Sequence, residues 1–218
     1  MVGPRADAEE TPRAAADAFV EAVRVGVLPV VSGADPRAAR VEGERTVGAT
    51  TTLDFVLPPM SEAALAPLVR SLMYGTEDVQ RLRVEATSSP GQELRRVAEF
   101  PPLPEISAPF PWVPVPTHRA TLKHGTLRVQ FADDLPEAAG EELEAAIRAW
   151  FRLVEVHGFT LESGVSSGFC TDAGDAFPDE WVFQFQFLTV DAHACRPLLR
   201  YLADIHAVHP ITEAGFSW

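Results

Sequence analysis

The clearest structural pattern in the chain is WVFQFQFLTVDAHACRPLLRYLAD, residues 181–204. Phe183, Phe185 and Phe187 alternate with glutamines, and a period of two is typical of a strand in a sheet with one solvent-exposed face. Asp191 is a favourable helix N-cap, and the apolar residues beyond it recur at helical spacing. The expected core stripe of this helix is Cys195, Leu198, Leu199, Leu202 and either Ile205 or His206. The stretch therefore predicts a strand followed by a helix.

A strand and a helix are also expected upstream of residue 160. Residues 121–131 alternate in polarity, which predicts a strand. Asp134 followed by Glu137 resembles a capping box, so we expect a helix to be capped by Asp134 and to end at Gly158. The apolar stripe of this helix is Leu143, Ile147, Trp150, Phe151 and Val154.

The remaining elements complete a recognisable order. We expect a strand from Phe159 toward Phe169, a loop rich in Gly and Asp over 171–180, and a last strand over 211–218. The order is then strand, helix, strand, strand, helix, strand. This is the ferredoxin-like split βαβ arrangement, an antiparallel sheet with both helices on one face. We expect residues 118–218 to form one such unit.

The first half of the chain repeats this pattern. Shifted by 130 positions, residues 51–74 align with residues 181–204 with six identities in 24 pairs. The expected helix cap Ser61 falls on Asp191, and a proline follows six residues later in both segments. We interpret the match as an internal duplication. The fold class predicted is α+β, with two tandem ferredoxin-like repeats.

The first repeat, residues 1–100, is less complete. A shift of 131 places a helix near residues 11–25, the second strand at Val27–Val31 and the fourth at Val79–Ala86. The opening strand is missing, and residues 92–100 are a candidate substitute. The sheets of two such repeats can join edge to edge or face each other across a cavity.

A proline-rich linker, residues 101–117, is expected to join the repeats. Seven prolines lie within 101–116, and proline fixes φ and removes a backbone donor, so this segment is predicted to be an extended connector. Its PxxP spacings are also compatible with an aromatic-lined groove on a partner. Phe110 and Trp112 are expected to hold the linker against a folded unit.

Composition excludes several classes of function. The 218 residues include 46% hydrophobic residues, and 31 acids against 18 bases give a net charge of −13. Lys123 is the only lysine. Nucleic-acid and anionic-membrane surfaces need clustered Lys and Arg, so we expect neither partner. No apolar run approaches the length of a membrane span, and the first ten residues do not resemble a secretory signal. Two cysteines do not make a disulfide framework, and we expect a cytoplasmic protein.

Four apparent chemical motifs have better structural explanations. Gly164–Gly168 fits the nucleophile elbow G-x-S-x-G, but no helix can follow Ser166, so we predict no catalytic residue. The acids of 172–180 lack the spacing of a calcium loop. His206 and His209 are better explained as helix C-terminal residues than as zinc ligands. Cys195 lies on the apolar stripe and is expected in the core. We predict no metal and no cofactor.

The function predicted is non-enzymatic binding of a basic protein, as in an inhibitor or immunity-type protein. Residues 110–218 carry 15 acids against 7 bases (net −8), whereas residues 1–109 carry 16 against 11 (net −5). Acidic surfaces steer basic partners. The candidate partner-binding residues are Asp172, Asp175, Asp179, Glu180, Glu137, Glu141 and Glu144.

An alternative is a small-molecule-binding protein or small enzyme that uses an apolar pocket between the repeats. The candidate lining residues are Phe131, Trp181, Phe183 and Phe185, and an enzyme would need an ionisable residue there, such as His124 or His157. The sequence leaves the oligomeric state open.

Overall fold

The protein has an α+β fold. The computed structural model describes residues 11–48, 50–74, 103–114, 122–159, 167–190 and 192–217. The helices in these ranges are α1 (Pro12–Arg24), α2 (Glu62–Tyr74), α3 (Glu137–Glu155) and α4 (Ala192–His206), with a short 3-10 helix, η1, at Pro36–Ala38. The strands are β1 (Arg40–Val47), β2 (Thr50–Val56), β3 (Trp112–Val113), β4 (Leu122–Phe131), β5 (Ser167–Phe177), β6 (Glu180–Thr189) and β7 (Ile211–Ser217).

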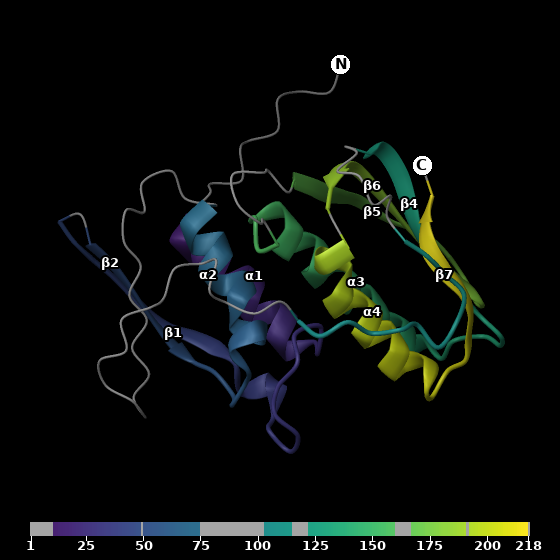
Figure 1. The fold of residues 1–218 in the computed structure, drawn as a ribbon, viewed down its shortest axis with the longest axis horizontal. Helices are drawn as coiled ribbons and strands as arrows, with labels where there is room; N and C mark the ends of the chain where they lie inside the picture. Colours follow the sequence, from purple (N-terminus) through teal and green to yellow (C-terminus); the bar gives the residue numbers. More distant parts are fainter. Residues whose placement is uncertain are drawn as a thin grey trace.

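The strands form two sheets. β1 and β2 make an antiparallel pair, whereas the larger sheet has the order β3-β7-β4-β6-β5. Within the larger sheet the neighbours β7-β4, β4-β6 and β6-β5 are antiparallel, and the two-residue β3 is parallel to β7. The helices lie between the two sheets, with α1 and α2 toward the small sheet and α3 and α4 toward the large one (Figure 1).

This layering differs from both expected arrangements of the sheets. The halves meet through helices, with α1 packed on α3, and their sheets neither join edge to edge nor face each other. An amphipathic helix on a two-stranded sheet still has an apolar side to bury, and the helices of the other half cover it. Buried residues of both halves therefore form one continuous core, which includes Phe19, Leu68, Trp150 and Phe185.

Several predictions from the apolar pattern are confirmed. The stripe of α3 is buried, and so are Cys195, Leu198, Leu199 and Leu202 of α4. Phe183 and Phe185 are at most 1% exposed, while Gln184 between them is exposed. Ser61 accepts a hydrogen bond from the Ala64 amide, as expected of an N-cap.

Three boundaries in the second half differ from the prediction. α3 begins at Glu137 after Pro136, with no side-chain cap, so Asp134 is not its N-cap. At its end, His157 rather than Gly158 adopts a left-handed φ of 63°. β5 runs to Phe177, so most of the expected 171–180 loop is strand and only a short turn joins it to β6. Pairing with β6 offsets the weak strand propensity of Gly and Asp in β5.

The first half also corrects one prediction. Val27–Val31 is not a strand; Val27 and Leu28 are buried in the loop after α1, and the strand before β2 is β1. The apolar character of the segment reflects packing in a loop rather than pairing. Asp191, Val79–Ala86 and residues 92–100 lie outside the described residues.

The described part of the proline-rich connector is anchored as expected. Residues 103–111 have no regular structure, and Trp112 then enters β3 at the sheet edge, where proline-flanked strands are tolerated. Phe110 is buried, with its ring 5.4 Å from that of His206, and the ring of Trp112 lies 5.8 Å from that of Phe216.

Candidate functional site

Some of the predicted partner-binding acids lie close together at one end of the large sheet. The amide of Phe131 donates to the carbonyl of Asp179, and the amide of Leu135 donates to the carbonyl of Pro178, both at 2.8 Å. These two bonds hold the segment after β4 against the turn between β5 and β6. Asp179 therefore lies beside the exposed residues Asp133 and Asp134.

The acids of α3 extend this region along the helix. Glu137, Glu141 and Glu144 are spaced by four and three residues, so they share one face of the helix. Glu137 and Glu141 are exposed, whereas Glu144 pairs with Arg148 at 2.8 Å. The unpaired negative charge is therefore concentrated near the start of α3.

The other predicted acids contribute differently. Glu180 pairs with Arg128 at 2.9 Å and is the more buried member of that pair. Asp172 and Asp175 lie on β5, where the Asp172 backbone is opposite Gln184 of β6. The structure therefore unites Asp179 with the beginning of α3 and places Asp172 and Asp175 along the edge strand.

An exposed aromatic residue adjoins the turn. Phe177 is the last residue of β5 and is 52% exposed, and Asp179 follows two residues later. Sequence reasoning missed Phe177, Asp133 and Asp134, because Asp134 was interpreted as a cap and Phe177 as part of a loop. The available signal was a pair of consecutive acids, Asp133 and Asp134, one residue beyond the end of the predicted strand.

The predicted pocket residues occupy the core. Phe131, Phe183 and Phe185 are 3%, 0% and 1% exposed and lie on the helix-covered face of the sheet. The rings of Phe151 and Phe185 have centroids 6.1 Å apart. Trp181 is half-buried, and its indole lies against Gly140 of α3.

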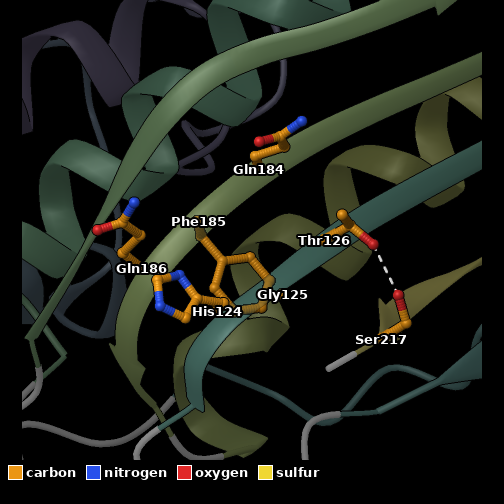
Figure 2. A pocket seen from close by; sticks show the side chains of 7 residues that line it. All are labelled: His124, Gly125, Thr126, Gln184, Phe185, Gln186 and Ser217. Carbon is orange, nitrogen blue, oxygen red and sulfur yellow. Dashed lines mark hydrogen bonds between the residues drawn. The ribbon is translucent and has the colours of Figure 1, made fainter.

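A shallow hollow of about 380 Å³ lies on the open face of the large sheet (Figure 2). Its lining residues are His124, Gly125, Thr126, Gln184, Phe185, Gln186 and Ser217. The hydroxyls of Thr126 and Ser217 bond to each other at 2.6 Å, while His124 is opposite Gln186 in the strand register. The hydroxyls belong to the β4–β7 pair and the imidazole lies on β4 beside β6, so the hollow presents hydrogen-bonding groups from three strands.

His206 and Cys195, two further side chains with reactive groups, have structural roles. Nδ1 of His206 accepts a hydrogen bond from the amide of Ile211 at 2.9 Å, which ties the end of α4 to β7. Cys195 is buried in the core. Ser166 lies outside the described residues. Within the described ranges, no group of three His, Cys, Asp or Glu side chains is placed to hold a metal ion, and no helix is long and apolar enough to cross a bilayer.

Comparison with known proteins adds no relative. No family model matches the chain, and no curated protein or solved structure does so either.

Proposed function

We propose that the protein is a non-enzymatic binding protein that docks a basic protein partner at one end of its large sheet. We call this region the acidic end, and it comprises Phe177, Asp179, Asp133, Asp134, Glu137 and Glu141. An inhibitor or immunity-type protein that masks a cationic toxin or nuclease is the biological form that this surface fits.

The observation that carries the proposal is the exposed Phe177 at a turn whose backbone is hydrogen-bonded to the segment that carries Asp133 and Asp134. Interfaces concentrate their binding energy in a few central aromatic anchors surrounded by a polar rim. Phe177 has the exposure of such an anchor, and Asp133, Asp134 and Asp179 supply the rim. A rim of one sign accelerates encounter with a partner of the opposite sign.

The test measures binding to a panel of cationic nucleases and toxins by surface plasmon resonance at about 50 and 150 mM salt. We expect at least one partner whose affinity for the wild type falls as the salt concentration rises. At the same salt concentration, Phe177→Ser should bind that partner about tenfold more weakly, because the aromatic anchor is lost. The matched control neutralises exposed acids elsewhere with Asp17→Asn and Asp204→Asn. Affinity that is indifferent to salt, or that the control lowers as much as Phe177→Ser, would contradict the proposal.

We also infer that the two halves are diverged copies of one ferredoxin-like unit. The element bounds support this inference, because β2 and β6 begin 130 residues apart, as do α2 and α4. β1 and β5 end 130 residues apart, and α1 and α3 end 131 residues apart. The order β7-β4-β6-β5 is the strand order of a split βαβ unit. A cytoplasmic location stays a prediction from the sequence.

A further inference from the structure

A second hollow, of about 370 Å³, lies where the two halves and the connector meet. It is formed by the loop after α1, the first residue before α2, the connector and one face of α4. Its lining residues are Pro29, Val30, Val31, Ser61, Leu103, Pro104, Ile106, Arg196 and Arg200. Two arginines of α4 therefore share one hollow with mainly apolar residues from the other three segments.

The two arginines differ in their partners. Nη1 of Arg196 donates to the carbonyl of Leu103 at 2.6 Å, and Nη2 lies 3.0 Å from the carboxylate of Glu105. Arg200, one helical turn further along α4, is half-buried and makes no hydrogen bond or ion pair with any residue in the described ranges. Arg196 holds the connector in place, and Arg200 leaves one positive charge uncompensated.

The surroundings make this uncompensated charge significant. A guanidinium beside apolar walls has lost part of its hydration, so a counter-ion interacts with it more strongly there than on an open surface. Ser61, the N-cap of α2, also lines the hollow, which places the positive end of the α2 dipole at the same wall. In a chain of net charge −13 this is a locally positive site.

We infer that this hollow binds a small monocarboxylate with an apolar body, held through its carboxylate by Arg200. A ligand with a single carboxylate is enough to balance the charge of the hollow, because Arg196 already pairs with Glu105 and only the charge of Arg200 has to be matched. Arginine forms two parallel hydrogen bonds with a carboxylate, which fixes its orientation. Val30, Leu103 and Ile106 supply the surface for the apolar body, and the volume is at the lower end of the range for ligand pockets.

This site is separate from the acidic end. None of the lining residues belongs to that surface, so either proposal can fail without the other. A small molecule would then bind beside Arg200, and not among the buried phenylalanines that the sequence suggested as pocket residues.

The test is calorimetric titration of the full chain with octanoate and 3-phenylpropanoate, with 1-octanol as the uncharged match for octanoate. We expect saturable one-site binding of at least one acid and none of comparable affinity for 1-octanol. Arg200→Met should weaken binding about tenfold or more, because it removes the charged hydrogen bonds and keeps the apolar stem. Arg152→Met removes an exposed arginine from α3 and should leave binding unchanged.

A second variant, Ile106→Trp, tests the place of the apolar body and should abolish binding, because the larger side chain fills the hollow. Thermal melts verify that each variant is folded. The inference is overturned if neither acid binds, if 1-octanol binds as well as octanoate, or if Arg200→Met binds like the wild type.

Discussion

The indole ring of Trp181 occupies the space that any side chain at position 140 would need. An ideal Cβ on Gly140 would overlap Cζ2 of this ring. The pair joins the first turns of α3 to the beginning of β6, next to the acidic end. Glycine in the helix therefore serves close packing against the sheet, and this sets the position of Glu137 and Glu141 relative to the turn.

Gly140→Ala should destabilise the protein by about 1–3 kcal/mol, because the ring must move from a packed position. In a helix without this contact the same change stabilises by about 0.5–1 kcal/mol. Urea denaturation of the variant and the wild type shows whether the substitution lowers or raises the free energy of unfolding. The double variant with Trp181→Leu should lose less stability than the sum of the two single variants. A stabilising Gly140→Ala would contradict the packing described.

Trp150→Phe should lower the free energy of unfolding by about 1–3 kcal/mol. Nε1 of Trp150 donates to the carbonyl of Ala194 at 2.7 Å within the core, and this bond joins α3 to α4. The variant removes the donor and part of a buried ring. Trp112→Phe at the half-buried sheet edge is the control and should cost less. Equal losses in the two variants would show that the hydrogen bond contributes little.

Tyr201 should make the unfolding free energy fall as pH rises above about 10. Burial, and next the negative charge of Glu142, raise the pKa of Tyr201 above the ordinary tyrosine value. Below that pH the phenol is protonated in both states and contributes no slope. Above it, the unfolded chain loses the proton that the folded protein retains. Tyr201→Phe should therefore remove part of this decline; identical pH profiles for variant and wild type would refute the assignment.

Arg196→Met should accelerate amide hydrogen exchange in the connector around residues 103–106. The guanidinium holds this segment through Leu103 and Glu105, so its loss should allow more frequent local opening. Exchange measured by mass spectrometry checks this, with peptides from β6 as the internal reference. Arg200→Met is the matched control and should leave connector exchange unchanged, since Arg200 makes no bond to the described connector residues.

The elements with strong periodicity were predictable because their signal is local. The stripe from Leu143 to Val154 and the alternation around Phe183 each record which face is buried. Val27 and Leu28 were misassigned because burial in a loop leaves the same apolar run as a short strand. Asp134 was misassigned because the helix begins three residues later, at Glu137, with Pro136 in the N-cap position and no side-chain cap.

The candidate sites were only partly predictable. Asp179, Glu137 and Glu141 followed from local charge, but their proximity to Asp133 and Phe177 depends on the two backbone hydrogen bonds across the β5–β6 turn. Arg196 and Arg200 share a helix face that the sequence alone displays. Nothing local indicates that Pro29, Ser61 and Ile106 lie opposite them.

The helix faces, the strands around Phe183 and Phe216, and the acidic surplus follow from the amino-acid sequence, because they depend on residue type and on spacing within one element. Tertiary structure alone decided that α1 packs on α3, that the sheets lie outside the helices, and that a hollow forms beside Arg200. These features depend on contacts between residues far apart in the chain, where complementary shape and shared burial select the partner.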